Sequence, residues 1–155
     1  MTVQYVGVIS DTHGLLRDEV KRAFRGCSRI IHAGDIGTLS VLQDLERIAD
    51  VVAVRGNTDR GEWARSLKES EHLELGGNRI YIIHDLGSLP LTVPAAAVDI
   101  VIYGHSHMPD IRYRDGVLYL NPGSAGPRRF GLPASIALMR IEKDGVFPEI
   151  IELAA

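Results

Sequence analysis

The sequence contains a single cysteine, Cys27, among its 155 residues. One cysteine cannot form an intrachain disulfide, and it cannot build a zinc cage made of several thiolates. We interpret Cys27 as a small buried residue at the end of a helix. Any metal that the chain binds must therefore be held by histidine, carboxylate and amide side chains.

The sequence also lacks a long hydrophobic run and an excess of positive charge. No stretch approaches the roughly 18 apolar residues that a membrane helix needs, and no basic and apolar leader follows Met1. The net charge is -3, whereas proteins that bind nucleic acid or anionic membranes usually carry a basic excess. We therefore expect a cytoplasmic protein with no membrane contact and no dedicated nucleic-acid surface. The composition leaves open whether the chain forms a homo-oligomer.

The length and composition fit one domain that spans residues 1–155. Hydrophobic residues make up 45% of the chain, which is enough for a packed core. In the first half, apolar runs at 4–9, 30–31 and 51–54 alternate with amphipathic patterns at 15–24 and 38–49. Strands that alternate with amphipathic helices predict a parallel sheet built from crossover connections.

The second half has the pattern of hairpins, because short turns rich in glycine, asparagine and aspartate separate pairs of apolar runs. A buried strand is expected at 100–103, after a loop at 86–97 with one helical turn. The sequence therefore predicts an α/β fold in which two mixed sheets pack face to face with helices outside. The expected hairpins pair 72–75 with 79–83, 111–114 with 117–120, and 135–141 with 146–152.

Potential metal ligands follow five of the predicted strands. In open α/β sheets, ligands bind beyond the carboxyl ends of the strands, so we expect these side chains to meet. Residues two apart in an extended segment point the same way, which pairs Asp11 with His13 and His105 with His107. The full set of candidates is Asp11, His13, Asp35, Asn57, His84, His105 and His107.

These candidates are too many for one ion. Carboxylate and amide oxygens mixed with imidazoles suit Mn, Fe, Zn, Co or Ni. We expect Asp35 to bridge two ions with one oxygen on each, which would place them roughly 3.5–4 Å apart. The positive charge of two divalent ions exceeds the negative charge of the Asp11 and Asp35 carboxylates and a hydroxide. Because Asn57 is neutral, the site keeps a net positive charge. A phosphate ester is the substrate that such a site serves best.

The order of these motifs resembles that of the calcineurin-like metallophosphoesterases, and in particular their short bacterial and archaeal YfcE-type phosphodiesterases. The family pattern has Asp-x-His, Gly-Asp, Gly-Asn-x-Asp, a lone His after a strand, Gly-His-x-His-x-Pro and Asn-Pro-Gly-Ser. Here the corresponding segments are 11–13, 34–35, 56–59, His84, 104–109 and 121–124, and the resemblance covers residues 4 to about 150.

This resemblance implies a four-layer αββα sandwich and a dinuclear hydrolase for small phosphate esters, with Mn²⁺ as the expected metal. A hydroxide between the metals would attack in line. One metal would be held by Asp11, His13, Asp35 and His107, and the other by Asp35, Asn57, His84 and His105. Asp35, Asn57 and His105 are also expected to act in catalysis, and Asn57, Ser124 and Arg128 to contact the substrate.

The chain departs from the family pattern at two places. After His84 the family continues Gly-His, whereas Asp85, Leu86 and Gly87 stand here, and the following segment is shorter and lacks the usual helix. Larger members carry a histidine after the metal-binding Asn as a general acid, and that position is Thr58 here. The substrate rim beside His84 and the proton donor are therefore not given by the resemblance.

Several residues near the motifs have more than one interpretation. We expect His32 to pack beside the metals rather than to bind one. Asp59 could hold a metal-bound histidine or could cap a turn. The turn at 121–124 is expected to support the site, and Arg128 and Arg129 either face a phosphate or belong to a solvated loop.

A different class of function uses the same fold. In the scaffold subunit of the retromer coat it is a protein-binding module with a degraded metal site that lacks the His of Asp-x-His. This chain keeps His13. We therefore expect hydrolysis, with a non-catalytic scaffold as the alternative.

Overall fold

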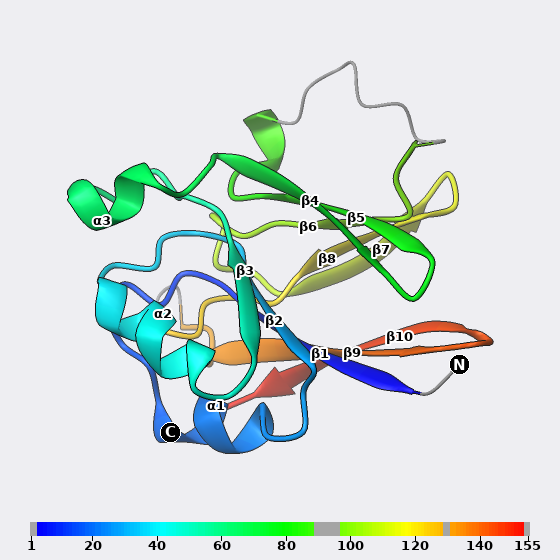
Figure 1. Cartoon of the computed structure of the whole chain (residues 1–155), viewed down its shortest axis with the longest axis horizontal. Helices are drawn as coiled ribbons and strands as arrows, with labels where there is room; N and C mark the ends of the chain where they lie inside the picture. The colour runs from blue at the N-terminus through cyan, green and yellow to red at the C-terminus, as the bar shows by residue number, and fades with distance from the viewer. Residues whose placement is uncertain (1–2, 89–96, 129–130, 154–155) are drawn as a thin grey trace.

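The computed structural model describes residues 3–88, 97–128 and 131–153. Two five-stranded sheets stack on each other, with helices below the first (Figure 1). The first sheet has the order β10-β9-β1-β2-β3 and the second β4-β5-β6-β8-β7. The elements are β1 (Gln4–Ile9), α1 (Asp18–Ala23), β2 (Arg29–His32), α2 (Leu39–Glu46), β3 (Asp50–Ala53), α3 (Glu62–Arg65), β4 (Ser70–Leu75), β5 (Asn78–Ile83), the 3-10 helix η1 (Leu86–Ser88), β6 (Ile100–Ile102), β7 (Asp110–Arg114), β8 (Val117–Asn121), β9 (Ser135–Glu142) and β10 (Gly145–Glu152).

The first sheet confirms the predicted parallel arrangement of the first half. Strands β1, β2 and β3 are parallel, while β9 pairs antiparallel with β1 and with β10. Helix α1 begins at Asp18, later than the predicted start at residue 15. The reason is a turn in which the amide of Leu15 donates to the carbonyl of Thr12 (2.9 Å). The residues after β1 therefore form a loop before the helix begins.

The second sheet contains the predicted hairpins β4–β5 and β7–β8, and β9–β10 forms the third as a part of the first sheet. Strands β5, β6 and β8 run parallel to one another, which was not predicted. Parallel strands usually show an amphipathic helix between them, and the segments that join these strands have no such pattern. The short helix α3, in a charged stretch, was also missed.

The main core lies between the two sheets. Val8 and Ile31 from the first sheet and Ile82, Ile102 and Leu120 from the second belong to one cluster of buried side chains. A second cluster packs α1 and α2 against the other face of the first sheet through Val20, Phe24 and Leu45. The α/β sandwich is therefore as expected.

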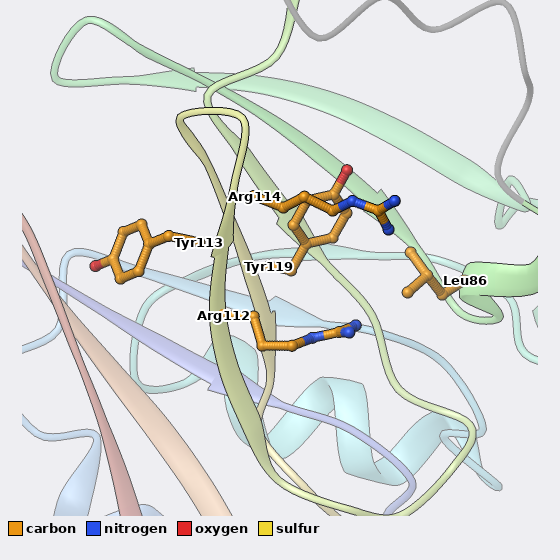
Figure 2. A pocket seen from close by; sticks show the side chains of 5 residues that line it. All are labelled: Leu86, Arg112, Tyr113, Arg114 and Tyr119. Atoms are coloured by element: carbon orange, nitrogen blue, oxygen red, sulfur yellow. The ribbon is translucent and has the colours of Figure 1, made fainter.

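The outer face of the second sheet carries η1, which is the predicted helical turn, while residues 89–96 of the expected loop lie outside the described part. A cavity of about 390 Å³ on this face is lined by Leu86, Arg112, Tyr113, Arg114 and Tyr119 (Figure 2). Tyr113 points away from the other four, because neighbouring residues of a strand face opposite sides. None of the predicted metal ligands lines this cavity. Within the described residues, no helix has both the length and the apolar character to cross a membrane.

Candidate metal centre

The predicted ligands meet where strands of the two sheets end. They follow the carboxyl ends of β1, β2 and β3 in the first sheet and of β5 and β6 in the second. Two groups of side chains with ligand atoms within 4.8 Å of one another lie there. The first group is Asp11, His13 and His107, and the second is Asp35, His84 and His105.

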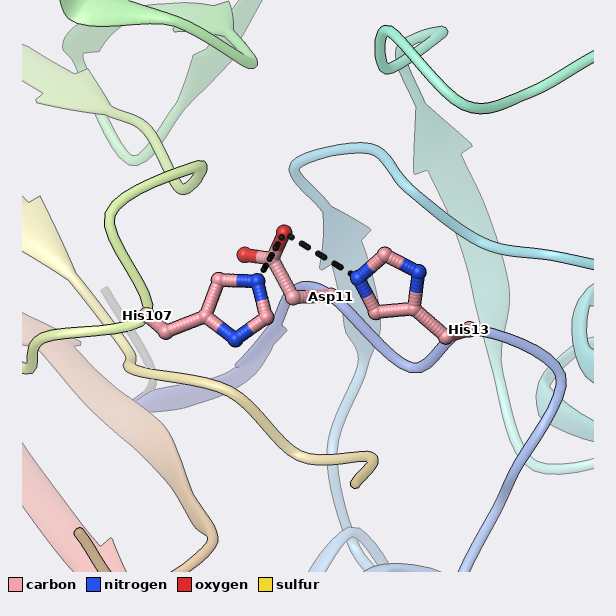
Figure 3. A group of neighbouring side chains, drawn as sticks. All are labelled: Asp11, His13 and His107. Atoms are coloured by element: carbon pink, nitrogen blue, oxygen red, sulfur yellow. Dashed lines mark ion pairs between the residues drawn. The ribbon is translucent and has the colours of Figure 1, made fainter. Parts of the chain in front are cut away.

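The first group is centred on one oxygen of Asp11. Its Oδ1 lies 3.4 Å from Nε2 of His107 and 3.9 Å from Nε2 of His13 (Figure 3). The other oxygen, Oδ2, accepts hydrogen bonds from the hydroxyl of Ser10 (2.7 Å) and the amide of His105 (3.1 Å). Oδ1 accepts no hydrogen bond from the described residues. Nε2 of His84, from the second group, also lies 3.9 Å from this oxygen, so Asp11 presents one bare oxygen to three imidazoles.

The second group is centred on one oxygen of Asp35. Its Oδ2 lies 3.2 Å from Nε2 of His84 and 3.8 Å from Nε2 of His13, so it faces both groups. Its Oδ1 accepts a hydrogen bond from the amide of Thr58 (2.9 Å). Oδ2 is thus the oxygen that faces both groups, and the expectation that each oxygen of Asp35 holds a different ion stays a prediction. Asn57 joins this group through its Oδ1, which lies 3.2 Å from Nδ1 of His105.

Five of the ligand residues have positive φ angles, between 47° and 72°. The expectation that neighbouring ligands lie in extended segments is therefore wrong, because these residues occupy the left-handed region within loops. Non-glycine residues in this region are uncommon and cost of order 1 kcal/mol or more each, and such strain concentrates at functional sites. The residues are Asp11, His13, Asp35, His105 and His107.

Two glycines let the loops approach the carboxylates. A Cβ atom on Gly56 would overlap the amide nitrogen and Oδ1 of Asp35, and one on Gly104 would overlap the hydroxyl of Ser10. Neither glycine needs a left-handed backbone, since the close approach alone requires the absence of a side chain. The Gly-Asn and Gly-His motifs are therefore steric requirements of the site.

Asp59 braces the loops, as in the turn-capping interpretation. Its Oδ2 accepts the amide of Gly56 (2.9 Å) and its Oδ1 accepts the amide of Gly37 (3.0 Å). Both oxygens of this buried side chain thus bind backbone N–H groups.

The turn at 121–124 supports the two histidine loops. The side-chain Nδ2 of Asn121 donates to the carbonyl of Gly104 (3.2 Å) and to the hydroxyl of Ser106 (3.1 Å). Ser124 is buried, and its hydroxyl donates to the carbonyl of Asp11 (3.1 Å). A contact between Ser124 and the substrate stays a prediction.

Two supporting residues were not predicted from the sequence. Ser10 binds Asp11, as described above, and the guanidinium of Arg17 donates to the carbonyls of Ala125 (3.2 Å) and Gly126 (2.9 Å). The only sequence signal for these roles was the hydroxyl of Ser10, which directly precedes the Asp-x-His motif. Arg128 is exposed, and Arg129 lies outside the described residues.

The hydrogen bonds of His84 fix its tautomer. Nδ1 lies 2.7 Å from the carbonyl of Ala33, to which it must donate because a carbonyl only accepts. In the neutral ring, Nε2 then carries a lone pair that faces Oδ2 of Asp35. Burial lowers the pKa of His84, but Asp35 and Asp11 more than offset this effect, so the pKa is raised. A proton or a cation between these atoms would remove the repulsion.

The pKa values of the Asp11 and Asp35 carboxylates are shifted in opposite directions. Burial raises the pKa of Asp11 above its usual value, and the neighbouring imidazoles offset only part of this effect. Burial also acts to raise the pKa of Asp35, but the His84 imidazole and the Thr58 amide outweigh it and hold the pKa well below its usual range. Asp35 is therefore the carboxylate that keeps its charge most strongly.

His32 packs beside the centre, as expected. Its Nδ1 accepts the amide of Gly34 (3.1 Å), so its Nε2 donates to the hydroxyl of Thr12 (3.0 Å), which donates to the carbonyl of Ile36 (2.8 Å). The side chain is fully buried, and burial lowers its pKa to about 3. His32 is thus a neutral structural link between two ligand loops.

Among known proteins, a family model described as the calcineurin-like phosphoesterase superfamily domain matches residues 5–144. A protein named "Probable metallophosphoesterase" from Methanothermobacter thermautotrophicus is 34% identical over 97% of this chain and 93% of its own length. The structure of an archaeal phosphodiesterase superposes with a TM-score of 0.80 at 25% identity, over 96% of this chain and all of that one. YfcE, a phosphoesterase from E. coli, gives a TM-score of 0.70 at 26% identity over 87% of each chain.

The fold also occurs in Vps29. Vps29 from Entamoeba histolytica in complex with zinc superposes with a TM-score of 0.73 at 24% identity, over 96% of this chain and 99% of that one. At this identity the likeness concerns the fold alone. The family model and the metallophosphoesterase relative are more informative, because they match the sequence that forms the centre. The chain therefore belongs to the calcineurin-like phosphoesterase superfamily and is similar to its short YfcE-type members.

Proposed function

We propose that this metallophosphoesterase hydrolyses a small phosphate diester with two divalent ions, of which Mn²⁺ is the expected one. The ions would be held by the two groups described above and would supply a hydroxide nucleophile between them and neutralise charge on the phosphate. A cytoplasmic location also remains a prediction.

The observation that carries this proposal is the set of buried ligand atoms without hydrogen bonds. Among the described residues, Oδ1 of Asp11, Nε2 of His13 and Nε2 of His84 are buried and have no hydrogen-bond partner. Buried polar groups are nearly always paired, because an unpaired one costs roughly 1–3 kcal/mol. Carboxylate oxygens and imidazole nitrogens are ligands of divalent transition metals, so the residues fit the ions that the family uses.

Residues at the open side of the centre suit contact with the substrate. Asn57 and His105 are exposed, whereas Asp11, Asp35 and His84 are buried. The amide nitrogen of Asn57 donates hydrogen bonds and can bind a phosphate oxygen without adding negative charge. His105, which lies against Asn57, would orient the ester beside it. Buried residues would thus hold the ions while exposed ones position the phosphate.

The ligand set favours hydrolysis over a non-catalytic scaffold. A scaffold has no need for strained backbone at five ligand positions or for unpaired buried atoms. His13 lies 3.8 Å from Asp35, between the two groups, and is part of this arrangement.

Hydrolysis of bis(p-nitrophenyl) phosphate before and after chelation tests the proposal. We expect turnover with Mn²⁺, loss on chelation and recovery when the metal is restored. His13→Ala should lose most of this activity, while Lys143→Ala, in the turn between β9 and β10 and away from the centre, should retain it. A folded protein that binds the metals and leaves the ester intact would favour the scaffold.

A further inference from the structure

A pocket of about 300 Å³ adjoins the second metal group. Asn57 and His84 both line it, so it opens directly onto the candidate centre. Its volume is at the lower end of the roughly 300–1,000 Å³ that ligand pockets occupy. The pocket therefore has room for one organic group of a small diester.

The floor of the pocket is formed by β5. Tyr81 and Ile83 line it and are almost fully buried, and Ser70 of β4 lies opposite Ile83 in the sheet. The ring of His72, opposite Tyr81 on the neighbouring strand β4, makes an edge contact with the Tyr81 ring at 4.8 Å between ring centroids. The floor is therefore largely apolar and held in place by the sheet.

The walls of the pocket carry charge. Arg55 and Glu69 both line it and form an ion pair (3.3 Å), and the amide of Arg55 also donates to the carbonyl of Lys68 (2.8 Å). Asp85 lines it as well, and its Oδ1 accepts the amide of Gly87 (3.0 Å). Within the described part of the chain, no cationic side chain forms an ion pair with Asp85. The charges of Arg55 and Glu69 cancel, so Asp85 leaves the pocket with a net negative charge.

We propose that this pocket binds one organic group of the diester and that Asp85 selects groups with N–H or O–H donors and without negative charge. This inference rests on the proposed function. An ionised carboxylate only accepts hydrogen bonds, so hydroxyl and ammonium groups can bind it. A second anionic group would meet like charge next to the phosphate. The preferred substrates are therefore diesters of an amino alcohol or a polyol.

Three p-nitrophenyl phosphodiesters that share a leaving group test the selection. Their second groups are 2-aminoethyl, 2-hydroxyethyl and 2-carboxyethyl, and kcat/KM is measured for each with the metal-loaded protein near pH 7. We expect kcat/KM for the aminoethyl ester to exceed that for the carboxyethyl ester on the order of tenfold. A partly exposed charge pair has a modest effect, but here attraction of the ammonium group and repulsion of the carboxylate act in the same direction. The hydroxyethyl ester should lie between them. Equal values for all three would overturn the proposal.

Two variants shift this ratio in opposite directions if the pocket binds the group. Asp85→Asn keeps an oxygen for the amide of Gly87 and should bring the ratio of aminoethyl to carboxyethyl esters close to one. Arg55→Gln leaves Glu69 unpaired and should increase the ratio. Asp144→Asn, in the turn between β9 and β10, makes the same charge change away from the pocket and should leave the ratio as it is.

The outcomes separate this inference from the proposed function. Hydrolysis of every ester at rates that neither variant alters would refute the role of the pocket and leave the phosphodiesterase intact. A ratio that changes equally in Asp144→Asn would assign the effect to the overall charge and would also refute it. Hydrolysis of none of the esters would refute the proposed function itself.

Discussion

The amide of Thr58 donates to Oδ1 of Asp35 at 2.9 Å, and this bond decides which oxygen of the carboxylate faces the centre. Oδ2 is left beside the imidazoles of His84 and His13. The loop after β3 thus orients a carboxylate that follows β2. The same division occurs at Asp11, where Ser10 and His105 bind Oδ2 and leave Oδ1 bare.

Replacement of Asp35 by Asn should reduce metal content and rate together. The amide oxygen of Asn can still accept the hydrogen bond from Thr58, but the variant has no negative charge between the two groups. We expect a loss of at least about a hundredfold in kcat/KM. Mutation of a residue that only hydrogen-bonds a metal ligand already costs roughly ten- to a hundredfold in metal affinity or activity. Metal analysis of the purified variant provides the second measurement. Asp99→Asn, directly before β6 and paired with Arg79, makes the same charge change and should keep both properties.

Replacement of Gly56 by Ala should damage the centre without removing a ligand. The new methyl group would overlap the backbone and carboxylate of Asp35, so either that residue or the loop must move. Overpacking of this kind costs typically 1–3 kcal/mol, and we expect this loss in the free energy of unfolding together with lower metal content. Gly87→Ala is the comparison, because its methyl group would make one tight contact, 3.3 Å from the side-chain Oδ1 of Asp85, which a side chain can relieve and which involves no metal ligand. Normal metal binding by Gly56→Ala would refute the steric role of this glycine.

His32 should make the metal-free protein less stable in acid. Its pKa is 6.5 in an ordinary environment and about 3 in the fold, so between these values the unfolded chain binds more protons at this position. The contribution is fully present above pH 6.5 and declines as the pH falls toward 3, by up to about 1.4 kcal/mol per pH unit. His32→Asn removes the titrating group and can keep the bond from Gly34.

Urea unfolding of both proteins at pH 7 and pH 5, in the presence of a chelator, measures this effect. We expect the wild type to lose about 2 kcal/mol more than His32→Asn between the two pH values. The same pH dependence in both proteins would mean that His32 does not carry the proton uptake.

The absence of an imidazole at position 58 should make the rate depend on the leaving group. The resemblance places Thr58 where larger family members are expected to carry a histidine as general acid, and Asp59 cannot substitute for it because both of its oxygens bind backbone amides. General acid catalysis is worth roughly 10²–10⁴-fold, so its absence matters most for poor leaving groups. We expect aryl diesters to react far faster than alkyl ones.

A series of esters with graded leaving-group pKa measures this dependence, and Thr58→His should flatten it if the new ring reaches the leaving oxygen. A flat profile in the wild type, with chemistry as the rate-limiting step, would show that another residue supplies the proton.

The sequence was sufficient to predict which residues meet at the centre. Apolar runs that end on glycine and a polar residue mark strand ends, and the ligands follow such ends in both of the sheets that were predicted to pack face to face. It could not predict which oxygen of Asp11 or Asp35 stays bare, because partners such as Ser10 and Thr58 act only once the loops have packed. The positive φ angles of His105 and His107 were missed for the same reason.

The order in which the strands pair in the second sheet could not be predicted from the sequence either. Residues 84–99 connect the parallel neighbours β5 and β6, and the β7 hairpin connects β6 to β8. The sequence of neither connection has the helical periodicity by which crossovers are identified. Local turn signals at Gly76 and Gly116, by contrast, were enough to predict the hairpins, because the partners lie close in the chain.

Titration of the metal-free protein with Mn²⁺, with bound metal and diester hydrolysis measured on the same samples, tests the central claim most directly. We predict that activity rises with occupancy and reaches its maximum at about two ions per chain, the number that the paired groups around Asp11 and Asp35 would hold. Full activity in a protein that metal analysis shows to be free of metal, or a maximum at one ion per chain, would contradict it.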